Sequence, residues 1–140
     1  MSVSKGSAQW TGNIKGKGVM KPENAPDAPF SLGTRFEGVK GTNPEELIGA
    51  ALSGCFSMAL SIGLEGAGAK PESIHTVAEV KLDKQGAGFA ITEIVLTSKV
   101  VAPGIDDAKF QTVADETKKG CPVSKALAGT KITLHASLGK

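Results

Sequence analysis

Aromatic residues and clusters of like charge are what this sequence has least of. It contains five Phe, one Trp and no Tyr, which leaves few rings on which nucleobases could stack. The 16 Lys+Arg nearly balance the 14 Asp+Glu, for a formal net charge of +2, and the lysines are scattered. Because nucleic-acid-binding surfaces need clustered positive charge, these shortages argue against a nucleic-acid partner.

The N-terminus lacks the features of a secretory signal. MSVSKGSAQWTG has no apolar core and no cleavage pattern, so we expect a cytoplasmic protein. In that reducing compartment, the two cysteines, Cys55 and Cys121, are expected to be a reactive pair or two inert thiols, and not a structural disulfide. The length of 140 residues predicts a single domain, residues 1–140.

Closely spaced metal ligands are missing as well. Cys55 and Cys121 are far apart in the sequence, and His75 and His135 lie in separate alternating segments. A zinc site made from these four residues would contain none of the short spacings typical of such sites. We therefore expect no metal and no cofactor, and interpret each histidine as a strand residue at a sheet surface or edge.

What the sequence does contain predicts an α+β fold with antiparallel sheet. The clearest helix has Asn43 as its N-cap, Pro44 at its first position and Glu46 completing a capping box, and it should end near Gly66. The other expected elements, in chain order, are one or two strands in 2–20, a loop at 21–29, an edge or bulged strand at 30–38, a hairpin of 73–84 with 88–103, helices at 106–119 and 121–129, and a strand at 131–138.

The segment from Leu47 to Leu64 carries no charge. A membrane span needs about 20 apolar residues with basic or aromatic flanks, whereas glycines and serines interrupt this run. We therefore expect a buried helix and no membrane partner. One small sheet and a second helical region cannot cover all its sides, which predicts a homodimer with these helices in contact. Small residues would allow the close approach: Ala50, Gly54, Ala59 and Gly63.

The two cysteines differ in their local setting. Cys55 lies in the middle of the apolar helix, where a free cysteine is commonly a small buried hydrophobe. Burial there would raise its pKa unless a cation reaches it. Cys121 directly precedes Pro122 and is a candidate N-cap residue, so backbone amides would lower its pKa. From local physics, Cys121 is the more thiolate-like of the two.

Arg35 is a cation just ahead of this helix. A guanidinium beside Cys55 would favour the thiolate, although an arginine in such a place is more often a surface or salt-bridged residue. A carboxylate would be needed to hold the arginine in position by a bidentate pair. The candidates are Glu37, Glu45 and Glu46.

Three stretches together resemble the osmotically inducible protein C / organic hydroperoxide resistance family (OsmC/Ohr). They are GTRFEGVKGTNPEELIGAALSGCFSMALS, the hairpin containing GFAITEIVL, and GCPVSKAL. The resemblance covers essentially the whole chain, is weakest over 19–30, and is closest to the osmotically inducible branch. It implies an intertwined α+β homodimer with long buried central helices, antiparallel β-sheets outside, and active sites at the subunit interface.

The resemblance also implies a thiol-dependent peroxidase acting in oxidative and osmotic stress defence. Cys55 matches the peroxidatic cysteine, Cys121 the resolving cysteine, Arg35 the residue that activates the thiolate, and Glu45 the carboxylate that orients Arg35. The implied substrate is an organic hydroperoxide, with hydrogen peroxide as a further candidate. A Cys55 sulfenic acid and a Cys55–Cys121 disulfide would form in turn, and an external dithiol of the lipoyl type would reduce the disulfide.

Helix geometry adds one prediction. Glu45 and Cys55 are ten residues apart on one helix, so about 15 Å apart along its axis. That separation is too large for one compact contact through Arg35. We therefore expect Arg35 and Glu45 to serve Cys55 of the partner subunit.

Two other functions stay open at this point. The chain could be a non-catalytic, stress-induced ligand-binding protein whose cysteines are merely buried. It could also be a redox sensor, in which the disulfide signals without turnover. Turnover with a dithiol would distinguish the enzyme from both.

Overall fold

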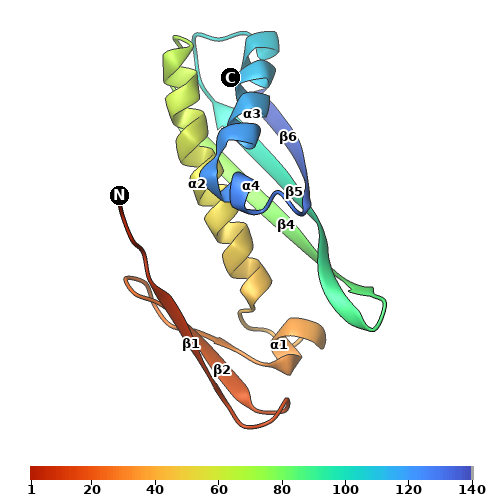
Figure 1. Cartoon of the computed structure of the whole chain (residues 1–140). Coiled ribbons are helices and arrows are strands. Elements are labelled where there is room, and N and C mark those ends of the chain that lie inside the picture. The colour runs from red at the N-terminus through yellow and green to blue at the C-terminus, as the bar shows by residue number, and fades with distance from the viewer. Residues whose placement is uncertain (140) are drawn as a thin grey trace. The chain divides into compact units, whose positions relative to one another are not determined.

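Strands β1 (Gly6–Thr11), β2 (Lys17–Pro22) and β3 (Ala28–Phe30) pair in that order as an antiparallel sheet (Figure 1). They belong to the first of two compact units, Met1–Leu47; the second begins at Ile48. The computed structural model describes residues 1–139. The strands expected in 2–20 are confirmed, and the expected loop is shorter than 21–29 because β2 and β3 extend into it. Pro29 is accommodated because β3 is an edge strand.

The strand expected over 30–38 is wrong beyond Phe30, where the structure has helix α1 (Leu32–Phe36). A capping box starts this helix: Ser31 Oγ accepts from the Thr34 N–H at 3.2 Å, and Thr34 Oγ1 accepts from the Ser31 N–H at 2.9 Å. A helix this short has no apolar periodicity to reveal it. The Ser-x-x-Thr spacing was the signal that could have identified it.

Helix α2 (Pro44–Gly66) confirms the expected long helix. Asn43 Oδ1 accepts the Glu46 N–H at 2.9 Å, which is the predicted N-cap bond. The helix ends in a turn with Gly68 at positive φ, where the Ala69 N–H reaches back to the Leu64 carbonyl at 3.0 Å.

The second unit contains a three-stranded sheet of β4 (Ser73–Gln85), β5 (Gly88–Val101) and β6 (Lys131–Gly139). The predicted β4–β5 hairpin is confirmed. The expected antiparallel pairing is wrong for β6, which runs parallel to β5. Helices α3 (Asp107–Gly120) and α4 (Pro122–Ala126) lie between these strands in the sequence, and a helical crossover is what a parallel pair requires.

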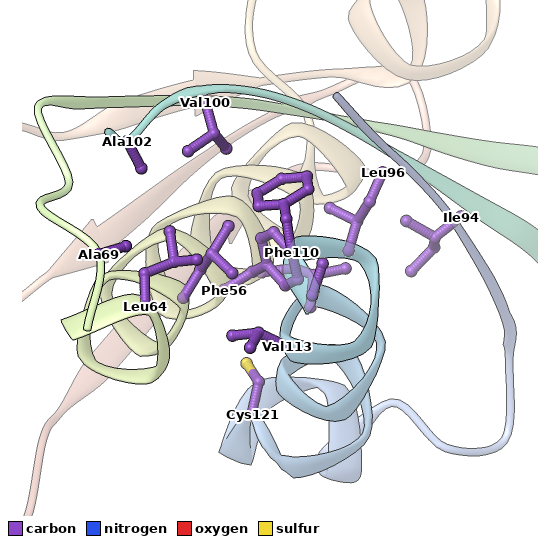
Figure 2. Close-up of a cluster of buried hydrophobic side chains, with 13 residues drawn as sticks. Phe56, Leu64, Ala69, Ile94, Leu96, Val100, Ala102, Phe110, Val113 and Cys121 are labelled. Atoms are coloured by element: carbon purple, nitrogen blue, oxygen red, sulfur yellow. The ribbon is translucent and has the colours of Figure 1, made fainter. Parts of the chain in front are cut away.

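Helices α2 and α3 lie against this sheet, and the core of the second unit forms between them (Figures 1 and 2). Side chains of β4 alternate between half-buried and exposed, so only one face of the sheet is covered. Four leucine and phenylalanine side chains four residues apart on α2 are fully buried in the core, each worth about 1.5–3 kcal/mol of burial free energy: Leu52, Phe56, Leu60 and Leu64.

The opposite side of α2 is apolar and uncovered in the single chain. Met58 and Ile62 are 71% and 62% exposed. Gly54 also faces open space, because no heavy atom lies within 4 Å of the position that a Cβ would take there. Within residues 1–139, α2 is the helix long and apolar enough to cross a membrane by length and composition. Gly63, expected on the dimer face, instead faces α3, because a Cβ there would lie 3.0 Å from Val113 Cγ1.

Candidate active site

Cys55 lies on α2 beside the buried stripe and is half-buried. Its side chain packs against the core cluster without belonging to its fully buried part. The helix therefore holds the thiol at the edge of an apolar interior, where it is partly accessible.

Cys121 lies at the junction of two helices. It is the C-cap of α3, with its N–H donated to the Thr117 carbonyl at 2.9 Å, and also the N-cap of α4, with Pro122 at the first helical position. Its side chain is 1% exposed. Figure 2 shows its sulfur turned toward Val113 of the core cluster. The predicted N-cap position of Cys121 is confirmed.

The two thiols are free and lie close enough for each to affect the pKa of the other. Burial, followed by the contact with Cys121, raises the pKa of Cys55. Burial acts to raise the pKa of Cys121 too, but the nearby Cys55 thiol, the Ser124 side chain and the backbone N–H groups of Ser124 and Val123 hold it below its ordinary value. The local prediction that Cys121 is the more acidic thiol is confirmed in direction.

Arg35 and Glu45 form an ion pair within the first unit. Arg35 Nη2 lies 2.6 Å from Glu45 Oε1, and Arg35 Nε lies 3.0 Å and 3.3 Å from Oε1 and Oε2. Two guanidinium nitrogens thus engage the carboxylate, which gives the arginine a fixed orientation. Glu45 is the second residue of α2, where the helix N-terminus favours a negative charge.

Of the three carboxylates considered, Glu45 is the one paired with Arg35. Glu37 is the C-cap of α1 and Glu46 is exposed at the first turn of α2. The structure thus brings the four candidate residues into two pairs, Arg35 with Glu45 in the first unit and Cys55 with Cys121 in the second. Their catalytic roles stay predictions.

An apolar pocket of about 210 Å³ adjoins Arg35 in the first unit. The Trp10 and Phe30 rings are 5.5 Å apart, and the Arg35 guanidinium carbon is 5.2 Å from the centre of the Phe36 ring. Sequence reasoning missed this pocket because part of its wall is α1, which was expected to be a strand. Its lining residues are Trp10, Ile14, Phe30, Ser31, Leu32, Arg35 and Phe36.

The histidines take no part in either pair. His75 and His135 are exposed residues of β4 and β6, as expected for strand residues at a sheet surface. Among residues 1–139 there is no group of three or more His, Cys, Asp or Glu side chains arranged to hold a metal ion.

Comparison with known proteins places the chain in a family. The family model described as OsmC-like protein matches residues 37–135. The chain is 54% identical to peroxiredoxin OsmC of Escherichia coli over 96% of its own length and 95% of that protein. It is 32% identical to an organic hydroperoxide resistance protein of Xanthomonas axonopodis over 85% of its length and 83% of that protein.

A solved structure shares the fold. An OsmC-like protein from Mycoplasma pneumoniae matches with a TM-score of 0.78 at 14% identity, over 99% of both chains. The resemblance seen in the sequence, including the closer match to the osmotically inducible branch, is confirmed. This chain belongs to the OsmC family.

Proposed function

We propose that this protein is a cysteine-dependent peroxidase that reduces organic hydroperoxides to alcohols. The observation that carries the proposal is the contact between the Cys55 and Cys121 thiols at the edge of an apolar core. Two thiols so placed can be oxidised to a disulfide in one cycle. The relatives support the same reaction, since they are named a peroxiredoxin and an organic hydroperoxide resistance protein.

Cys55 is the attacking residue because it is the more accessible thiol. Its thiolate attacks the terminal peroxide oxygen, the O–O bond breaks, and the departing alkoxide takes a proton to become an alcohol. Cys55 is left as a sulfenic acid. The Cys121 thiolate then attacks the Cys55 sulfur, hydroxide leaves and becomes water on protonation, and the two residues form a disulfide.

An external dithiol completes the cycle. One of its thiolates opens the Cys55–Cys121 disulfide, and its second thiol resolves the mixed disulfide, so that the dithiol is oxidised and both cysteines are reduced. A lipoyl-type dithiol is our proposed reductant, hydrogen peroxide a second substrate, and stress defence in the cytoplasm the setting. The reaction needs no cofactor and no metal.

Cys55 needs a cation, because burial raises its pKa and the thiolate is the nucleophile. Arg35 is suited to this role, since Glu45 fixes its orientation. Glu45 and Cys55 are separated by ten positions on the continuous helix α2, about 15 Å along the axis. We therefore propose that Arg35 and Glu45 act on Cys55 of the partner subunit.

This arrangement requires a homodimer, and the uncovered side of α2 supports one. Met58 and Ile62 are apolar and exposed, and Gly54 is open to close approach. An apolar stripe of this kind is typical of a surface that another protein covers. A second copy of α2 would cover this stripe, and each chain of 1–140 would act as one functional domain.

The proposal is tested by the intact mass of the reduced protein after one equivalent of an organic hydroperoxide, followed by peptide mapping. We expect loss of two hydrogens per chain, mapped to a Cys55–Cys121 link, and reversal by a lipoyl dithiol with repeated turnover. Two unreacted thiols would contradict the peroxidase and leave a ligand-binding protein. A disulfide that forms but does not turn over would indicate a sensor.

A further inference from the structure

Ser124 is a buried hydroxyl without a role in the scheme above. Its residue is 6% exposed, and its Oγ is the one buried side-chain oxygen or nitrogen in residues 1–139 that has no hydrogen-bond partner. A buried hydroxyl without a partner is costly to the fold. Such an atom in a native protein calls for a reason.

The position of Ser124 points to that reason. Cys121 is the N-cap of α4 and Ser124 is the third residue of that helix. In a capping box, the side chain at this position returns to the N-cap N–H. Here that N–H is already donated to the Thr117 carbonyl of α3, so the Cys121 sulfur is the N-cap group left for Ser124.

We propose that Ser124 Oγ donates a hydrogen bond to Cys121 Sγ when that sulfur is a thiolate, and thereby assists both steps that use Cys121. The neutral thiol is a poor acceptor, which accounts for an unpartnered hydroxyl in the reduced, protonated state. A thiolate is a strong acceptor. Ser124 is among the groups that lower the pKa of Cys121, as is the Cys55 thiol, the titratable group that acts on it from α2.

The hydrogen bond from Ser124 should accelerate reduction of the disulfide more than its formation. Cys55 is the more accessible sulfur, so the reductant thiolate attacks Cys55 Sγ, the S–S bond breaks, and its electron pair leaves on Cys121 Sγ. A leaving thiolate that accepts a hydrogen bond leaves faster. In the preceding step the same bond raises the thiolate fraction of Cys121 but lowers its nucleophilicity, so the gain is smaller.

The test compares Ser124→Ala with Thr117→Val. Both changes remove a buried hydroxyl near Cys121, but Thr117 Oγ1 is bonded to the Val113 carbonyl at 2.7 Å. This titration uses a Cys55→Ser background, so that Cys121 is the one cysteine present. No reaction with peroxide is needed. The ultraviolet absorbance of the thiolate is measured against pH and reports the ionisation of Cys121. We expect Ser124→Ala to shift this titration to higher pH, and Thr117→Val to leave it in place.

A second, kinetic experiment rests on the proposed function and uses protein that keeps Cys55. We expect Ser124→Ala to slow reduction of the preformed disulfide by a dithiol by about threefold to tenfold, because leaving ability only partly follows the pKa. Ser124→Thr, which keeps a hydroxyl, should restore the titration and the rate. An unshifted titration with Ser124→Ala, or a Thr variant that behaves like the Ala variant, would overturn the proposal. Neither result would contradict the proposed peroxidase activity. That activity would be contradicted by thiols that stay unreacted in the mass measurement described above.

Discussion

Arg35 Nη2 approaches Glu45 Oε1 to 2.6 Å, yet the two side chains are unequally buried: Glu45 is 8% exposed and Arg35 36%. The carboxylate is held inside the first unit, and the guanidinium is held by it at the surface. Nε and Nη2 of the guanidinium bind Glu45 of the same chain. The exposed part of the guanidinium remains available to another group.

This asymmetry predicts different costs for removing each partner. Arg35→Ala leaves a buried carboxylate unpaired and should lower the free energy of unfolding by about 1–3 kcal/mol. Glu45→Gln leaves a neutral amide and a partly exposed cation, and should cost less. Urea denaturation of both variants and of the double variant measures this. If both single variants lose the same free energy of unfolding, the unequal burial of the two side chains does not determine the cost.

The shared site predicts complementation between inactive chains. Cys55→Ser and Arg35→Ala homodimers should both be inactive with an organic hydroperoxide, but a mixed dimer contains one site with both Cys55 and Arg35. Mixing the chains after unfolding and refolding should restore activity. The matched control replaces Cys55→Ser with the Cys55→Ser/Arg35→Ala double variant, which can complement in no arrangement. If mixed dimers form in the first mixture but activity is not restored, Arg35 does not serve Cys55 of the partner subunit.

The pH dependence of Cys55 oxidation should change when Arg35 is removed. Burial raises the pKa of Cys55, and the guanidinium is proposed to oppose this. Without it, the thiolate fraction at neutral pH falls. The second-order rate of Cys55 oxidation in Arg35→Ala should therefore be low at neutral pH and rise steeply as pH increases. Stopped-flow oxidation against pH measures this rate. A uniformly low rate at every pH would mean that Arg35 acts on the peroxide and not on the sulfur.

A charge on the uncovered side of α2 should prevent dimer formation. Met58→Glu and Ile62→Glu each place a carboxylate where apolar surface is proposed to be buried, at a cost of several kcal/mol to association. Sedimentation equilibrium should find monomers. Val77→Glu is the matched control, because Val77 is an exposed apolar residue of β4 in the second unit. Loss of the dimer with Val77→Glu alone would place the interface elsewhere.

The close approach of α2 and α3 predicts a cost for any side chain at Gly63. A Cβ there would lie 3.0 Å from Val113 Cγ1, so Gly63→Val should destabilise the protein by about 1–3 kcal/mol through overpacking. Val113→Ala should relieve part of that cost. A double-mutant cycle from thermal unfolding gives the coupling between the two sites. Additive effects would show that the contact is not the cause.

Local chemistry made some elements predictable. Asn43 and Pro44 fixed the start of α2, and the alternation and turn between β4 and β5 identified the hairpin. The Cys121-Pro122 pair located the start of α4 and the more acidic thiol. In each case neighbouring residues determine the structure, so the sequence pattern is sufficient.

Other features depend on residues that are distant in the sequence. Alternation in β6 does not reveal the direction of its neighbour, and only the intervening helices could have indicated the parallel pair. The choice of Glu45 over Glu37 and Glu46 followed from the family resemblance. The pocket beside Arg35 needs Trp10 and Phe30 from different strands, and no local pattern predicts their approach.

The parallel pairing of β5 with β6 has a consequence for the order in which the protein assembles. Strands β4 and β5 meet through a tight turn and can pair in microseconds. Strand β6 must wait until the chain has passed through α3 and α4, and its pairing closes a longer loop. During synthesis on the ribosome, the edge of β5 at Ile94 and Leu96 therefore stays open until the last strand emerges. In that interval the open edge of β5 can pair with a strand of another chain.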